Sequence, residues 1–188
     1  MNGAETTRTL LLLRHAKASQ PVGVDDVERP LSERGHRDAR AVGEQLLTWG
    51  TEPDLVLCSP AVRTRQTWDA VTAAGVRAGR VNYPDRLYDA FWSELVELVR
   101  ATPDHEATVL VVGHGPAIPE AAQLLAEDDA GASTQDGSSA DLAHTRRAHP
   151  RLAQPYPTSG LARFAVTLPW AGLAPGTARL DAFVVPRA

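Results

Sequence analysis

The sequence lacks most of the features that mark disulfide-rich, metal-stapled and membrane proteins. Cys58 is the only cysteine in 188 residues, which excludes an internal disulfide and argues against a structural zinc site. No apolar run approaches the roughly 20 residues that a membrane-spanning helix needs. Residues 1–7 carry no basic segment of the kind that begins an export signal. We therefore expect an unexported, cytoplasmic protein with no membrane partner.

The chain also lacks a strong overall charge. Its formal net charge of −4 gives no field that would attract nucleic acid, so no nucleic-acid partner is expected. A length of 188 residues indicates about one domain with an ordinary hydrophobic core. Any anion that the protein binds must therefore be attracted by a local cluster of basic side chains.

Two apolar runs end in histidine. Residues 10–13 are four leucines followed by Arg14 and His15, and residues 108–112 lead through glycine to His114. Each run is typical of a short strand buried on both faces. A surface Arg-His pair that closes a strand is the alternative for the first motif taken alone. If the strands are neighbours, both imidazoles project into the crevice at the carboxyl ends of the strands.

The remaining chain alternates between helical and strand patterns. Ser32 is a predicted N-cap for a helix that ends at Gly50. Ser59 is the predicted N-cap of the next helix, with Pro60 at its first position. Further strands are expected near residues 54–58, 81–83, 161–168 and 180–185, and further helices from about residue 93 and over 116–126.

Arg63 lies in the first turn of the second helix, where the helix dipole favours carboxylates over cations. A solvated arginine is one interpretation, and we favour a local anion site. Because a cation gains nothing structurally at this position, we expect Arg63→Ala to leave stability nearly unchanged or raised.

Convergence of Arg14, His15, Arg63 and His114 would indicate a phosphorylated substrate. Guanidinium groups match phosphate oxygens, and cationic neighbours keep an imidazole neutral and able to attack phosphorus. The second histidine could then donate a hydrogen bond to the phosphoryl oxygens. Arginines repel a metal ion and no third ligand is evident, so we expect no metal and no cofactor.

A proton donor for the leaving group is harder to identify. Asp89 and Glu94 are the candidates for a general acid. An acidic residue in the first turn of a helix is favourable anyway, which gives Glu94 a structural alternative, and Asp89 could equally be a loop residue.

Four motifs occur in order along the chain: Leu-Leu-Arg-His at 12–15, Arg-Pro-Leu-Ser-Glu-Arg-Gly at 29–35, Ser-Pro-Ala-Val-Arg at 59–63 and Val-Gly-His at 112–114. Together they resemble the histidine phosphatase superfamily, which has the phosphoglycerate-mutase-like fold, and within it the SixA-like phosphohistidine phosphatase branch. The resemblance spans residues 8–126 well and the terminal strands more loosely.

This resemblance implies that His15 is the nucleophile that becomes phosphorylated, and that Arg14, Arg63 and His114 bind the phosphoryl group. It also implies an α/β three-layer sandwich with helices on both faces of a mostly parallel six-stranded sheet. The implied strand order is 3-2-4-1-5-6, with strand 5 antiparallel.

The chain departs from the family pattern beside the nucleophile. Ala16 replaces the glycine that commonly follows the histidine, and Lys17 stands where an acidic residue is frequent. The carboxylate general acid of the sugar-phosphate members is not clearly matched. Phosphohistidine tolerates this lack, because its leaving imidazole can be protonated from solvent.

Residues 127–158 hold few large apolar groups and are predicted to be a flexible insert in a single domain that spans residues 1–188. Residues 156–160 would return beside the pocket, and the basic run at 144–151 could act as a lid or touch nothing.

We expect a metal-independent phosphatase that acts on protein phosphohistidine or a small phosphomonoester. A sugar-phosphate or nucleotide phosphatase, and a catalytically silent phosphate-binding or protein-interaction module, remain alternatives. The oligomeric state is left open.

Overall fold

The computed structural model describes residues 7–127, 149, 152 and 155–188. The elements follow in the order β1 (Arg8–Arg14), η1 (Asp26–Glu28), α1 (Glu33–Thr48), β2 (Leu55–Cys58), α2 (Val62–Ala73), β3 (Arg80–Asn82), η2 (Asp85–Leu87), α3 (Trp92–Arg100), β4 (Thr108–Gly113), α4 (Ala117–Leu125), β5 (Leu161–Val166), η3 (Trp170–Gly172) and β6 (Arg179–Val184). The strands and helices expected from the sequence are present, with small shifts at their ends.

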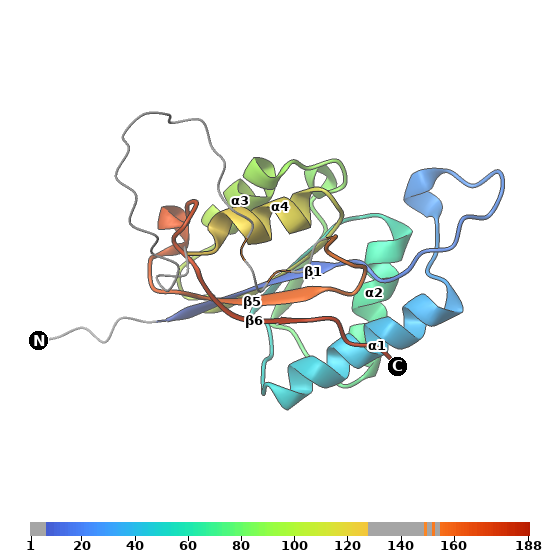
Figure 1. Cartoon of the computed structure of the whole chain (residues 1–188), viewed down its shortest axis with the longest axis horizontal. Helices are drawn as coiled ribbons and strands as arrows, with labels where there is room; N and C mark the ends of the chain where they lie inside the picture. The colour runs from blue at the N-terminus through green and yellow to red at the C-terminus, as the bar shows by residue number, and fades with distance from the viewer. Residues whose placement is uncertain (1–6, 128–148, 150–151, 153–154) are drawn as a thin grey trace, which may run out of the picture.

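Six strands form one sheet in the order β3-β2-β4-β1-β5-β6. Strand β5 runs antiparallel to both of its neighbours, whereas the other pairs are parallel. Helices α1 and α2 lie on one face of the sheet, and α3 and α4 lie on the other (Figure 1). The predicted fold class, including its strand order, is confirmed. Among the described residues, no helix is both long and apolar enough to cross a membrane.

Strand β1 is buried from both sides, as its leucine run predicts. Leu10 and Leu12 are fully buried in the cluster that includes α3 and α4, while Leu11 and Leu13 are fully buried in the cluster that includes α1 and α2. This alternation follows from the two-residue period of a strand. Because both faces are packed, the carboxyl end of β1 has a fixed place.

The predicted helix caps are confirmed for α1 but not for α2. The Ser32 hydroxyl accepts a hydrogen bond from the backbone N–H of Gly35 at 3.1 Å, and Gly50 follows the helix with a φ of 60°. Helix α2 instead has Ala61 as its N-cap residue, so the predicted capping role of Ser59 is wrong. The Ser59 hydroxyl bonds a distant histidine, and this tertiary contact overrides the local preference.

The segment predicted to be a flexible insert contributes to the core at its end. Leu152 and Tyr156 are 3% and 2% exposed, and the Tyr156 hydroxyl donates to the backbone carbonyl of Leu12 at 3.0 Å. These two large side chains anchor the end of the segment in the core, although the segment as a whole holds few large apolar residues. Residues 128–148, 150–151 and 153–154, and with them most of the proposed lid at 144–151, lie outside the described residues.

Candidate active site

The two histidines that end buried strands lie side by side. Strands β1 and β4 pair in parallel with Arg14 opposite Gly113, so the next residue of each chain segment, His15 and His114, leaves the sheet at the same edge. The backbone N–H of His15 donates to the Gly113 carbonyl at 2.9 Å, and the two imidazole centroids are 5.1 Å apart. The convergence expected from the sequence is therefore observed.

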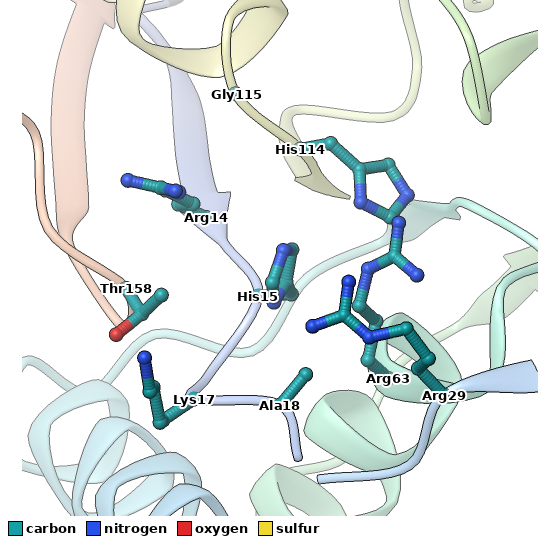
Figure 2. Close-up of a pocket in the computed structure, with 9 residues that line it drawn as sticks. All are labelled: Arg14, His15, Lys17, Ala18, Arg29, Arg63, His114, Gly115 and Thr158. Carbon is teal, nitrogen blue, oxygen red and sulfur yellow. The ribbon is translucent and has the colours of Figure 1, made fainter. Parts of the chain in front are cut away.

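A cavity of about 220 Å³ opens at this edge. Figure 2 shows His15 at its centre. The lining residues are Arg14, His15, Lys17, Ala18, Arg29, Arg63, His114, Gly115 and Thr158. Four of these side chains carry a positive charge and the others are neutral, so the lining attracts anions although the chain as a whole is negative.

The hydrogen bond of His15 fixes which of its ring nitrogens is free. Nδ1 lies 2.7 Å from the Ala16 carbonyl oxygen, which can only accept, so Nδ1 carries the proton. Burial, with a further contribution from the positive charges of Arg63 and Arg14, lowers the pKa of His15 to about 4. A neutral ring protonated at Nδ1 leaves the lone pair on Nε2.

His114 is oriented by the serine at the end of β2. Its Nε2 lies 2.7 Å from the Ser59 hydroxyl, and its Nδ1 is buried with no hydrogen-bond partner among the described residues. Burial and the neighbouring His15 lower the pKa of His114 to about 3. A neutral His114 whose Nε2 accepts from Ser59 would carry its proton on Nδ1, where it could serve a ligand.

Arg14 is held by the chain that returns to β5. Its Nη1 donates to the Tyr156 carbonyl, and the backbone N–H of Ser159 donates to the carbonyls of Arg14 and His15 at 3.1 and 3.2 Å. Thr158 lines the cavity between these contacts. The prediction that residues 156–160 return beside the pocket is confirmed.

Arg63 lines the cavity as the sequence suggested, but it has a structural partner. It is 7% exposed, and its Nη2 donates to Asp26 Oδ2 at 2.9 Å. Arg29, which sequence reasoning placed in a motif without a role in the site, also lines the cavity and donates from Nη1 to Asp26 Oδ1 at 2.7 Å. The expectation that Arg63 gains nothing structurally is therefore wrong, because an acidic residue 37 positions away pairs with it.

The two general-acid candidates do not line the cavity. Glu94 Oε2 accepts a hydrogen bond from the Phe91 backbone N–H at 2.8 Å at the start of α3, which is the structural role that the sequence also allowed. Asp89 is exposed. The geometry gives neither residue a position beside His15.

Sequence reasoning missed several residues that contact the side chains of the cavity lining. Ser59 was assigned to a helix cap, while Asp26 and Tyr88 received no role. The spacing of Asp26 three residues before Arg29 was a usable signal, because such a pair can meet within one turn. No local pattern indicated Tyr88, whose contact with Asp26 spans 62 positions.

Comparison with known proteins identifies the family. A model of the histidine phosphatase superfamily (branch 1) matches residues 10–95. Two solved structures named putative phosphohistidine phosphatase SixA are similar over the whole fold. The one from Nakamurella multipartitia is 35% identical, with a TM-score of 0.75, over 97% of this chain and 98% of its own. The chain belongs to the histidine phosphatase superfamily.

Other relatives agree with this membership. The SixA structure from Agrobacterium tumefaciens is 28% identical, with a TM-score of 0.70, over 95% of this chain and 99% of its own. An uncharacterized protein of Mycobacterium tuberculosis is 37% identical over 93% of this chain and 100% of its own. Membership in the superfamily assigns the chain to the phosphatase class of hydrolases.

Proposed function

We propose that this histidine phosphatase hydrolyses its substrate through a covalent phosphohistidine on His15, and that the substrate is protein phosphohistidine or a small phosphomonoester with a readily leaving group. The observation that carries the proposal is the state of His15. Its Nδ1 proton is committed to the Ala16 carbonyl, and its neutral ring offers Nε2 inside a cavity lined by three arginines. This arrangement provides a nucleophile that needs no base.

In the first step, Nε2 of His15 attacks phosphorus, and the bond between phosphorus and the leaving group breaks. The leaving group departs with the electron pair and takes a proton from solvent. The phosphorylated ring becomes cationic, and its Nδ1–H remains bonded to the Ala16 carbonyl. In the second step, water attacks phosphorus, the N–P bond breaks, and inorganic phosphate and neutral His15 are released.

The arginines bind and neutralise the phosphoryl oxygens during both steps. Arg14, Arg29 and Arg63 approach the cavity from β1, from the loop before α1 and from α2. The Nδ1 of His114 supplies a further donor when Ser59 donates to its Nε2. Several fixed donors around one phosphoryl group stabilise the charge that spreads over its oxygens in the transition state.

The cavity lining favours phosphohistidine within this substrate range. Its polar side chains are basic or neutral, which suits a leaving group that solvent can protonate. An imidazole leaving from phosphohistidine meets this condition, whereas a sugar alkoxide requires a side-chain acid. The names of the two SixA relatives support the same substrate class.

A trapping experiment tests the proposal. Brief incubation with a radiolabelled phosphohistidine peptide or aryl phosphate should leave acid-labile phosphate on His15, with no label and no turnover in His15→Ala. His105→Ala is the matched control, because His105 is exposed in the loop before the opposite end of β4. Label on Ser59 or Cys58 would overturn the mechanism. An unlabelled protein that binds phosphate but turns over neither substrate would support the silent binding module instead.

A further inference from the structure

A single carboxylate joins two arginines of the phosphate cavity. Asp26 Oδ1 accepts from Arg29 Nη1 at 2.7 Å, and Asp26 Oδ2 accepts from Arg63 Nη2 at 2.9 Å. The Tyr88 hydroxyl donates to Oδ2 as well, at 2.8 Å. Asp26 does not line the cavity, so its carboxylate contacts guanidinium groups of the lining without being part of that lining.

The contacts leave part of each guanidinium available to a phosphate. A guanidinium has five N–H donors in one rigid plane. Arg63 uses Nη1 and Nη2 on the backbone carbonyl and the carboxylate of Asp26. Arg29 uses Nε on the Ser19 carbonyl and Nη1 on Asp26. Each plane is therefore fixed by two contacts, and its remaining N–H groups donate to no further hydrogen-bond partner in the part of the chain that the structure describes, which leaves them available to a ligand.

Two alternative roles for Asp26 fit the structure less well. The hydrogen bonds from Tyr88 and Arg29, with the charge of Arg63, hold the pKa of Asp26 well below its usual range, so it keeps no proton to donate as an acid. A contribution to stability alone is the second alternative. The Asp26 side chain is 53% exposed, and ion pairs of exposed groups contribute little to stability.

Resting on the proposed function, we infer that Asp26 is a positioning residue for catalysis. Its carboxylate separates two like charges and orients Arg29 and Arg63 toward the phosphoryl group on His15. Tyr88 supports it, because its ring also packs edge-on against His114 at 5.6 Å and under the Arg63 guanidinium at 5.8 Å. The loop before α1 and the segment around η2 thereby act together on the site.

Asp26→Asn tests the inference, with Asp25→Asn as the matched control. Asp25 is the adjacent residue in the same loop, carries the same charge, is exposed and makes no capping bond with its side chain. We expect Asp26→Asn to lower kcat for an aryl phosphate roughly tenfold to a hundredfold, because misaligned donors act on the transition state. KM and the inhibition constant for inorganic phosphate should change much less. Asp25→Asn should leave all three constants at the wild-type values.

A double-mutant cycle separates positioning from general damage. Tyr88→Phe should lower kcat less than Asp26→Asn, and the double variant should match Asp26→Asn within about twofold, because the hydroxyl acts through the carboxylate. A kcat for Asp26→Asn equal to that of the wild type would overturn the inference alone. So would a fall in kcat that is matched by an equal rise in KM, or by a large fall in melting temperature. A wild-type protein that hydrolyses neither an aryl phosphate nor a phosphohistidine peptide would overturn the proposed function and the inference with it.

Discussion

His15 directly follows β1 and Cys58 ends β2, yet only His15 is in a state to act as a nucleophile. Burial raises the pKa of the Cys58 thiol to about 12, so this group stays protonated and unreactive at neutral pH. The same physical effect, burial, keeps His15 neutral, and for an imidazole the neutral form is the nucleophile. Burial therefore keeps the thiol in its unreactive protonated form and keeps the imidazole in its nucleophilic neutral form.

We expect His15 to remain neutral until the pH falls to about 4 instead of protonating near its ordinary value of 6.5. Between these two values the unfolded chain binds a proton that the folded chain does not, so the free energy of unfolding should decrease as the pH falls through this window. An NMR titration, with the His15 resonance assigned by its loss in His15→Ala, measures the pKa. Titration close to 6.5 would contradict the prediction.

Arg63→Ala should reduce both turnover and stability. The variant loses a phosphate-binding group and also the pairing with Asp26, which we expect to cost about 0.5–1 kcal/mol of unfolding free energy, a small loss because Asp26 is half exposed. Chemical denaturation together with aryl phosphate kinetics measures the two losses. Arg65→Ala is the control, since Arg65 is exposed on the same helix. Unchanged stability in Arg63→Ala would show that the pairing with Asp26 contributes nothing measurable to the free energy of unfolding.

At the scale of elements, the first turn of helix α1 packs closely against the backbone of Lys17, two residues after His15. A Cβ atom added to Gly35 would lie 2.1 Å from the Lys17 carbonyl oxygen, so only glycine fits there. This contact explains why the Arg-Pro-Leu-Ser-Glu-Arg-Gly motif ends in glycine. The start of α1 fixes the path of residues 15–17 and thereby one wall of the cavity.

Gly35→Ala should therefore weaken substrate binding as well as stability, whereas Gly43→Ala in the same helix should lower stability alone. A Cβ at Gly43 would meet Ala74 and the Val71 carbonyl at 2.7 Å, between α1 and α2. Both variants should melt at a lower temperature, but only Gly35→Ala should raise KM for an aryl phosphate when measured well below its melting temperature. An unchanged KM in Gly35→Ala would show that the backbone around Lys17 adapts.

The sequence predicted those features that depend on local pattern. The leucine run, the Ser32 cap and the histidines at the ends of the first and fourth strands are short-range signals, and the structure has them all. The contacts of Ser59 with His114 and of Asp26 with Tyr88 depend on segments that meet only in the folded chain. The motif resemblance supplied the strand order, which no local pattern contained.

On the scale of the whole molecule, charge is distributed unevenly. The chain has a net charge of −4, but its cavity gathers Arg14, Lys17, Arg29 and Arg63. Over the described residues, no group of three or more histidine, cysteine, aspartate or glutamate side chains is placed to hold a metal ion. Anions are attracted to this edge of the sheet and divalent cations are repelled from it.

Activity toward an aryl phosphate should survive dialysis against a strong chelator, because the arginines, which are always charged, neutralise the phosphoryl oxygens. The rates before and after dialysis are the measurement, and a parallel sample with magnesium restored is the control. Loss of turnover that a divalent metal restores would contradict this prediction.

The pairing of β1 with β4 also bears on how sequences of this kind can diverge. Main-chain hydrogen bonds set the relative position of His15 and His114, and these bonds do not depend on which apolar side chains fill the strands. Apolar substitutions that conserve the volume of the core are therefore compatible with the same chemistry. Deleting one residue within β1 would instead shift His15 by one strand position, about 3.3 Å, and turn its side chain to the other face of the sheet. The number of residues in β1 is therefore more tightly constrained than the identity of its apolar side chains.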